Sequence, residues 1–159
     1  MSDSACPFCR KLAGQDPWSA EGVLWEFPHS VAVLGPWQWY HGYCVVVARC
    51  HARELFDLPD DTRRAYLDEI TLVARAIHTA WQPIKMNYEL LGNQVPHLHC
   101  HLFPRYAHDP ARLAPVWLAL DAAERDPARR QQLETGPISR DESARRLREV
   151  LTTLGAPRA

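Results

Sequence analysis

The sequence has little net charge, no long apolar run and no internal repeat. Its 18 Lys and Arg residues nearly balance its 19 Asp and Glu residues, so the formal net charge is −1 and no strong field favours nucleic acid or a membrane surface. No apolar stretch approaches the roughly 20 residues that span a bilayer, and no secretory signal follows Met1. The composition, 47% hydrophobic and 23% charged over 159 residues, is typical of one soluble globular domain.

The cysteine content argues against a framework of disulfides. Five cysteines are present, an odd number, and without a secretory signal we expect a reducing cytoplasm. In that compartment the pair Cys6-x-x-Cys9 is more typical of a metal site or a redox pair than of a structural disulfide. Cys44 and Cys100 lie in expected strands and are predicted to be buried thiols, whereas Cys50 is expected to be exposed.

Apolar periodicity predicts an α+β domain with a mainly antiparallel sheet of about five strands. The first forty residues, rich in Trp, Pro and Gly, are read as short strands and turns. β-Branched and alternating apolar residues predict strands at 23–27, 30–34, 43–48, 85–91 and 97–103, with the first two joined as a hairpin.

Three segments are predicted to be helical. The longest, residues 57–81, carries apolar residues at helical spacing, and Asp57 is its expected N-cap. The last of the three begins with a capping box, in which Ser139 precedes Glu142 by three residues. The two shorter helices are expected at 115–126 and 139–155.

Three of the eight histidines lie two residues apart, at His97, His99 and His101. In a strand they would share one face, about 6.5–7 Å apart, with apolar residues on the opposite face. Such a row suits metal binding through neutral imidazole, or nucleophilic attack on phosphorus, because imidazole attacks without losing a proton. The alternative, a polar edge strand, does not explain the regular alternation.

The segment 97–103 alternates histidine with apolar residues and resembles the signature of the histidine triad (HIT) family. The resemblance also includes residues 6–10, 41–51 and 87–106. It implies a HIT-like domain over residues 1–106, with five strands and one long helix. Residues 107–159 would form a C-terminal helical extension packed on the same domain.

The resemblance assigns chemistry to individual residues. His99, the central histidine, would be the nucleophile that attacks the α-phosphorus of a nucleotide, and His101 would contact the phosphate and the leaving-group oxygen. Asn87 and Gln94 resemble family positions that bind the phosphate or its bridging oxygen. The turn that contains Asn93 could add backbone N–H donors to the anion.

The sequence departs from the family pattern in two places. Tyr43 stands where many HIT proteins have a histidine that supports the site, and His41, two residues earlier, is not expected to replace it. Near residues 35–40 the acidic or amide residue that binds ribose in relatives is missing, and Gln38 is the remaining candidate. Packing in the core or a dimer is favoured over stacking on a base for Trp18, Trp37 and Trp39.

A zinc ion is implied by the same resemblance. Related HIT proteins and the similar galactose-1-phosphate uridylyltransferases bind zinc through a Cys-x-x-Cys pair, a histidine that follows a strand, and the first triad histidine. The corresponding residues here are Cys6, Cys9, His51 and His97. Two thiolates and two imidazoles make a sound tetrahedral set, and the zinc would be structural. The competing interpretations are a turn with two free thiols, or a redox pair.

The implied function is a nucleotide hydrolase. It would cleave a phosphoanhydride or phosphoramidate bond at a nucleotidyl α-phosphate, in a dinucleoside polyphosphate or a nucleoside phosphoramidate, through a covalent nucleotidyl-histidine. Two alternatives stay open: a nucleotidyltransferase or phosphorylase that uses the same intermediate, and a zinc-stabilised nucleotide-binding protein with little turnover. The resemblance also implies a homodimer, and neither nucleic acid nor a membrane is an expected partner.

Overall fold

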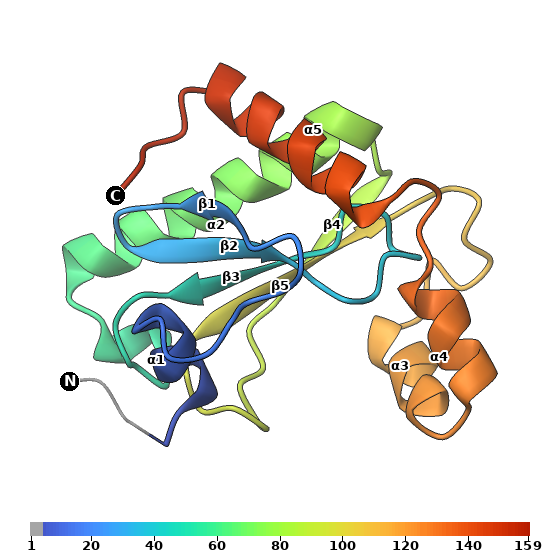
Figure 1. The fold of residues 1–159 in the computed structure, drawn as a ribbon, viewed down its shortest axis with the longest axis horizontal. Coiled ribbons are helices and arrows are strands. Elements are labelled where there is room, and N and C mark those ends of the chain that lie inside the picture. Colours follow the sequence, from blue (N-terminus) through green and yellow to red (C-terminus); the bar gives the residue numbers. More distant parts are fainter. Residues whose placement is uncertain (1–4) are drawn as a thin grey trace.

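Five strands form one antiparallel sheet in the computed structural model, which describes residues 5–159 (Figure 1). They are β1 (Val23–Glu26), β2 (Ser30–Leu34), β3 (Cys44–Ala48), β4 (Lys85–Glu89) and β5 (His99–Arg105). Their order across the sheet is β1-β2-β3-β5-β4, and every neighbouring pair is antiparallel. The predicted α+β class and the five strands are therefore confirmed, and β5 lies inside the sheet rather than at its edge.

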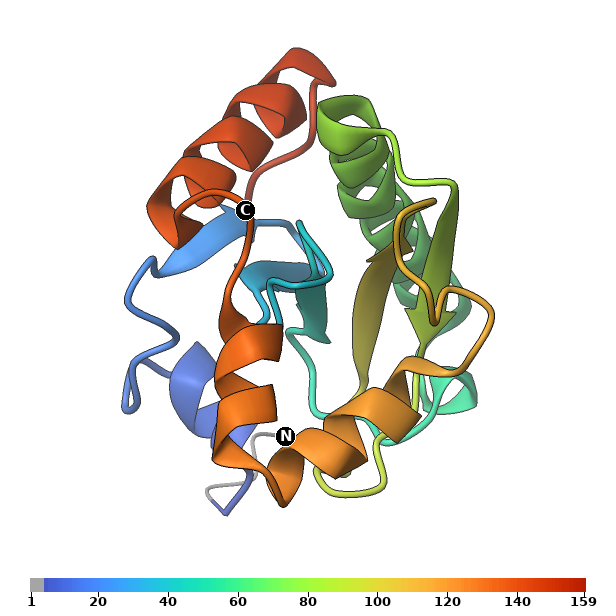
Figure 2. The ribbon, with the colours of Figure 1, turned by 90° about the vertical axis from the view of Figure 1, so that its right-hand side faces the viewer.

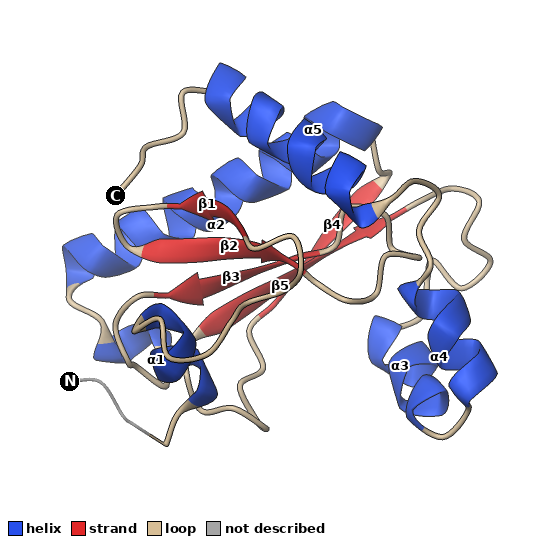
Figure 3. Cartoon of the chain, in the orientation of Figure 1, coloured by secondary structure: helices blue, strands red, loops and turns tan. Residues whose placement is uncertain are grey.

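Helices cover both faces of this sheet (Figures 2 and 3). They are α1 (Pro7–Leu12), α2 (Asp60–Trp81), α3 (Val116–Glu124), α4 (Pro127–Glu134) and α5 (Arg140–Thr153), with a short 3-10 turn, η1 (Leu55–Asp57), before α2. Both α2 and α5 lie on one side, and α1, α3 and α4 lie on the other (Figures 1 and 2). Within residues 5–159, none of the helices is long and apolar enough to cross a membrane.

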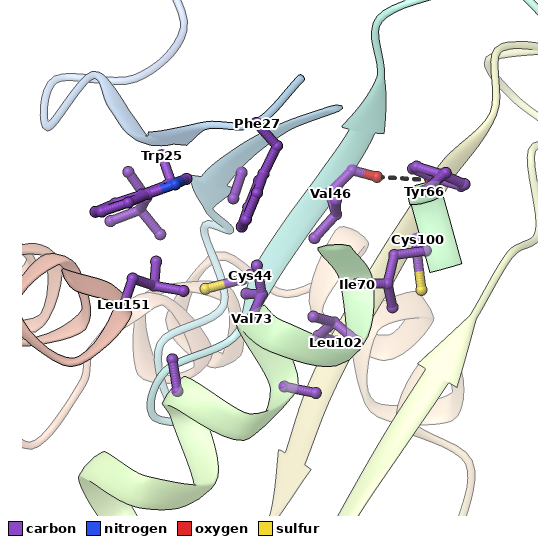
Figure 4. Close-up of a cluster of buried hydrophobic side chains, with 14 of the residues drawn as sticks. Trp25, Phe27, Cys44, Val46, Tyr66, Ile70, Val73, Cys100, Leu102 and Leu151 are labelled. Atoms are coloured by element: carbon purple, nitrogen blue, oxygen red, sulfur yellow. Dashed lines mark hydrogen bonds between the residues drawn. The ribbon is translucent and has the colours of Figure 1, made fainter. Parts of the chain in front are cut away.

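The main core lies between the sheet and the pair α2 and α5 (Figure 4). Because side chains alternate across a strand, Cys100 and Leu102 of β5 point into this core, while His99 and His101 point away from it. Tyr66 of α2 is fully buried there, and its hydroxyl donates to the Val46 carbonyl at 3.0 Å. The apolar half of the alternation thus fixes which face of β5 carries the histidines.

The start of the long helix differs from the prediction. Asp57 does not cap it: its carboxylate accepts from the backbone N–H of Glu54 and closes η1 instead. Leu58 precedes Pro59 and has extended backbone angles, φ −81° and ψ 141°. A residue before proline is pushed out of the helical region, so α2 begins only after Pro59.

Two short helices were not predicted. Helix α1 begins with Pro7 at its first position, after Cys6 in an extended conformation. Helix α4 also begins with a proline, and Asp126 caps it by accepting from the N–H groups of Ala128 and Arg129. Both carry the proline signal for a helix start, but both are short and bury a single residue each, Cys9 and Leu133, so they lack an apolar repeat at helical spacing.

The strand that carries the histidines begins at His99 and not at His97. The segment still runs beside the sheet, because Leu98 donates to Ala52 O at 2.7 Å and accepts from Ala48 N at 3.0 Å. The ring of His97 is fully buried. The prediction that 97–103 is one strand is therefore wrong for its first two residues.

Candidate functional site

His99 is held by the backbone just before it. Its Nδ1 lies 2.6 Å from the carbonyl oxygen of His97, so Nδ1 carries the proton and donates to that oxygen. The other ring nitrogen, Nε2, is then left with its lone pair. Burial lowers the pKa of His99, although the bond to the carbonyl opposes this shift. A neutral imidazole with a bare nitrogen is the form that a nucleophile requires.

His101 lies next along β5, on the same face. Its Nδ1 is 2.7 Å from the hydroxyl of Tyr43, the residue just before β3. The ring meets the rings of His99 and Trp117 edge to face, with centroids 4.8 Å and 5.3 Å apart. Burial lowers the pKa of His101 to about 4, and the neighbouring His99 adds to this shift. Both rings are therefore neutral near pH 7.

His97 points elsewhere and does not share the pocket of the other two histidines. Its Nε2 lies 2.8 Å from the carbonyl of Ala48, so that nitrogen carries the proton. Its Nδ1 faces the sulfur atoms of Cys6 at 3.4 Å and Cys9 at 3.6 Å. The hydrogen bond to the backbone fixes the tautomer whose Nδ1 lone pair points at the two thiols, as in metal-bound histidines.

The four predicted metal ligands lie together in the structure. One donor atom from each of Cys6, Cys9, His51 and His97 lies within 4.8 Å of the others, and His51 Nδ1 is 3.3 Å from the Cys9 sulfur. A tetrahedral zinc ion bonded to sulfur at about 2.3 Å and to nitrogen at about 2.0 Å sets these atoms about 3.5 Å apart. The residues therefore fit a zinc ion in number, chemistry and spacing, and the group could bind a metal.

A pocket of about 870 Å³ opens over His99 and His101. Its size suits a nucleotide, since small-molecule pockets commonly measure 300–1,000 Å³. The turn after β4 supplies Gly92, Asn93 and Gln94 to its wall, and Gly92 has φ +68°, which favours glycine. Aromatic rings line the remaining wall: Phe8, Trp18, Trp37 and Trp117.

Asn87, the remaining predicted substrate residue, and its neighbour Arg105 lie outside this pocket. Asn87 does not line this pocket; its side-chain oxygen accepts from Arg105 at 3.3 Å, and its proposed contact with phosphate stays a prediction. Arg105 is buried in an ion pair with Asp109, 3.0 Å away, and donates to two backbone carbonyls of the turn that follows β5. That arginine therefore anchors the chain and does not face the pocket.

Gln38 is not available for ribose. It is 1% exposed, and its amide nitrogen donates to the carbonyls of Gly35 and Tyr43. His41 packs against Trp81, with ring centroids 4.3 Å apart, away from the triad. Of the three tryptophans expected to pack rather than stack, Trp18 and Trp37 line the pocket, and Trp39 does not.

The sequence profile of the HIT domain matches residues 19–108, more than half of the chain. This chain belongs to the HIT family. It is 32% identical over 106 residues to Protein hit of Bacillus subtilis, covering 64% of this chain and 71% of that protein. It is also 25% identical over 108 residues to adenosine 5′-monophosphoramidase HNT1 of Saccharomyces cerevisiae, covering 65% of this chain and 64% of the yeast protein.

Solved HIT structures share the fold. A zinc-bound histidine triad family protein from Mycobacterium smegmatis superimposes with a TM-score of 0.67 at 22% identity, over 95% of this chain and 96% of that one. A HIT family member from Bacillus subtilis gives a TM-score of 0.58 at 25% identity, over 77% of this chain and 97% of that one.

Parts of the site in this HIT protein lie outside the matched region. Cys6, Cys9 and Phe8 precede residue 19, and Trp117 of α3 follows residue 108. The indole N–H of Trp117 donates to the carboxylate of Glu89, which lies opposite His101 in the sheet. Sequence reasoning missed Phe8 and Trp117, because neither lies near the triad along the chain and no spacing rule connects them to it.

Proposed function

We propose that this protein is a nucleotidyl hydrolase in which His99 forms a covalent intermediate at the α-phosphorus of a nucleotide. The observation that carries the proposal is the 2.6 Å bond from His99 Nδ1 to the His97 carbonyl. It leaves Nε2 as the free nitrogen of a neutral ring that lines a nucleotide-sized pocket. No other described residue combines a free nucleophilic nitrogen, a fixed orientation and access to this pocket.

The proposed reaction has two steps. In the first, His99 Nε2 bonds to the α-phosphorus while the bond from phosphorus to the leaving group breaks. His101, the next ring along the pocket, contacts a phosphoryl oxygen or the leaving atom. In the second step water attacks phosphorus, the mononucleotide departs and His99 is restored. The His97 carbonyl holds the Nδ1 proton throughout and stabilises the positive charge that develops on the ring.

The pocket and one relative support a proposed substrate class. Asn93 and Gln94 lie on its wall beside the histidines, where backbone and amide donors suit phosphate oxygens. The contact of Asn87 with phosphate stays a prediction, because its side-chain oxygen accepts from Arg105. The yeast relative is an adenosine 5′-monophosphoramidase, which supports a nucleoside phosphoramidate as the substrate here. A dinucleoside polyphosphate is the alternative, which the sequence leaves open. The partly buried rings of Trp18 and Trp37, which line the pocket, offer a place for the base.

Zinc is proposed to occupy the group Cys6, Cys9, His51 and His97. The donor set and its spacing carry this proposal, because the likeness to the zinc-bound Mycobacterium protein shows only the fold. When bound, zinc would join α1 to the segment before β5 as a structural cross-link. Since His97 supplies both a ligand nitrogen and the carbonyl that orients His99, the cluster supports the nucleophile from behind. A homodimer and a cytoplasmic location remain predictions.

Intact-protein mass spectrometry tests the reaction. The protein is mixed with an adenosine phosphoramidate and with diadenosine polyphosphates, quenched early, and digested to find the modified residue. We expect an adenylyl adduct on His99 in the wild type and none in His99→Ala, which should still bind nucleotide. Equal turnover by wild type and variant would refute the mechanism. Repeating the reaction with added inorganic phosphate shows whether water or phosphate takes up the nucleotidyl group.

A further inference from the structure

We propose that Tyr43 is a positioning residue that fixes His101 with its proton on Nε2, so that His101 presents an N–H donor to the pocket. The inference rests on the proposed function for its chemical meaning, since the donor would face the phosphoryl group or the leaving atom. Its structural part concerns only the hydrogen bond between two side chains.

The direction of the hydrogen bond follows from burial. Tyr43 is 2% exposed, and His101 Nδ1, at 2.7 Å, is the only hydrogen-bond partner of its hydroxyl within residues 5–159. If Nδ1 donated to the phenol oxygen, the buried O–H would have no acceptor, which costs about 1–3 kcal/mol. The phenol therefore donates to Nδ1. Burial also raises the pKa of Tyr43 well above its usual value, so the hydroxyl keeps its proton.

A neutral imidazole carries one N–H, and an accepting Nδ1 places it on Nε2. His99 has the opposite arrangement, with its proton on Nδ1 and its lone pair on Nε2. Two rings 4.8 Å apart thus offer different groups to one pocket: a nucleophile from His99 and a donor from His101. As phosphorus bonds to His99 and the leaving atom departs with the electron pair, the His101 N–H stabilises the developing negative charge, and solvent water supplies the proton that the leaving atom finally takes.

The surroundings of the Tyr43 ring are shaped to hold it. The ring stacks on Phe103 with centroids 3.9 Å apart and planes 5° apart. A Cβ added to Gly35 would lie 2.0 Å from Tyr43 Cε1, so only glycine leaves room for the ring. Gly35 needs no left-handed backbone, and its N–H donates to the Tyr43 carbonyl at 3.0 Å. The three atoms nearest to an added Cβ all belong to the tyrosine ring, so this ring is the nearest obstacle to a side chain at position 35.

Long-range ¹H–¹⁵N NMR of the histidine rings measures the tautomer directly, with His101→Gln used to assign the signals. In the wild type we expect His101 protonated on Nε2 with Nδ1 as an acceptor, and His99 protonated on Nδ1. A proton on Nδ1 of His101 would overturn the proposal. This measurement needs no substrate, so it tests the tautomer of His101 even if His99 shows no turnover. Failure of the proposed function and failure of this inference are therefore distinguishable.

Kinetics of Tyr43→Phe test the role in the reaction. The variant keeps the ring and the stack on Phe103 but removes the donor, so Nδ1 should lose its acceptor signature and kcat should fall roughly 10-fold, with KM changed less than about 2-fold. Tyr106→Phe is the matched control, because Tyr106 donates an equally short bond, 2.7 Å, to the His41 carbonyl outside this pocket. It should retain wild-type kcat. An unchanged kcat in a folded Tyr43→Phe would show that the tyrosine serves packing alone.

Discussion

The two ends of the segment from His97 to His101 have different surroundings. At the first end, sulfur atoms and a second imidazole surround a fully buried ring. At the other end, Tyr43 and Trp117 contact a ring that borders an open pocket. The three histidines are evenly spaced, yet one ring nitrogen of each has a different hydrogen-bond partner: the Ala48 carbonyl, the His97 carbonyl or the Tyr43 hydroxyl. That partner decides which nitrogen stays free, and so whether the ring is suited to bind metal, attack phosphorus or donate a hydrogen bond.

Replacing a cysteine at the first end should give the largest effect on stability. Cys9→Ser changes a proposed zinc ligand that is 6% exposed and faces both His51 and His97. We expect loss of bound metal and a fall in the free energy of unfolding of at least about 3 kcal/mol, because metal binding contributes directly to folding. Metal analysis and urea unfolding with and without a chelator measure both quantities.

Cys50→Ser is the control for this experiment, because Cys50 is an exposed thiol beside the cluster. It should keep the metal content and the stability of the wild type. If Cys9→Ser also kept its metal, the assignment of the ligands would be wrong, and the first end of the histidine segment would resemble an ordinary buried corner of the core.

The other end, at His101, should make stability depend on pH. The folded pKa of His101 is about 4, below the 6.5 of an unperturbed histidine, so the unfolded chain binds the proton first as the pH falls. This stabilisation is complete above pH 6.5 and is lost between pH 6.5 and 4, by up to roughly 3 kcal/mol. His101→Gln should flatten the dependence in that window, as measured by urea unfolding at several pH values.

His41 is a second buried histidine with a lowered pKa, and it separates the effect of pH on stability from the effect on turnover. Burial and the nearby Arg146 also lower its pKa to about 4, but its ring packs on Trp81, outside the pocket over His99 and His101. His41→Gln should therefore flatten the pH dependence of stability as His101→Gln does, while leaving turnover unchanged. A pH dependence that neither variant alters would mean that both rings become charged without cost in the folded protein.

Gly35→Ala tests whether the Tyr43 ring, which contacts His101, needs the space beside Gly35. The added methyl would overlap the Tyr43 ring, and we expect a loss of about 2 kcal/mol in the free energy of unfolding, since overpacking commonly costs 1–3 kcal/mol. Gly14→Ala is the contrasting variant: Gly14 has φ +70° and open space around it, so only backbone strain of about 1 kcal/mol is expected. Chemical denaturation gives both values.

A double variant separates the cause of the Gly35 effect. If the methyl acts through the ring, Gly35→Ala should cost much less once Tyr43 is also replaced by Ala, and the two changes should not be additive. Additive losses would indicate that position 35 needs glycine for its own backbone, and that the ring is not confined there.

The periodicity of the sequence was enough to predict the faces of the sheet but not the partners of the rings. Alternation along β5 placed Cys100 and Leu102 in the core, and this fixed where His99 and His101 point. The contacts that separate the roles of the histidines join distant residues: Cys6 meets His97 across 91 positions, and Tyr43 meets His101 across 58. Such contacts depend on how α1 and the strands pack, which no local pattern encodes.

The smallest effect on stability is expected for Trp117, a residue of the C-terminal part of the chain that contacts His101. Trp117 of α3 packs edge to face on His101 and Phe103, and its indole N–H donates to the Glu89 carboxylate. Trp117→Phe keeps an aromatic ring but removes this donor, so we expect a loss of about 1 kcal/mol in unfolding free energy. Because the smaller ring widens the pocket, KM should rise several-fold while kcat changes less.

Trp39→Phe is the matched control, since Trp39 is 37% exposed and lies outside the reaction pocket. It should leave both stability and KM close to those of the wild type. Equal KM values for the two variants would mean that α3 only covers the sheet. A selective rise for Trp117→Phe would instead show that a helix beyond the matched HIT region helps to bind the substrate. The His101 end would then differ from the His97 end in a further respect, because its wall would determine which nucleotides bind, whereas the proposed role of Cys6, Cys9, His51 and His97 is only to hold His99 in place.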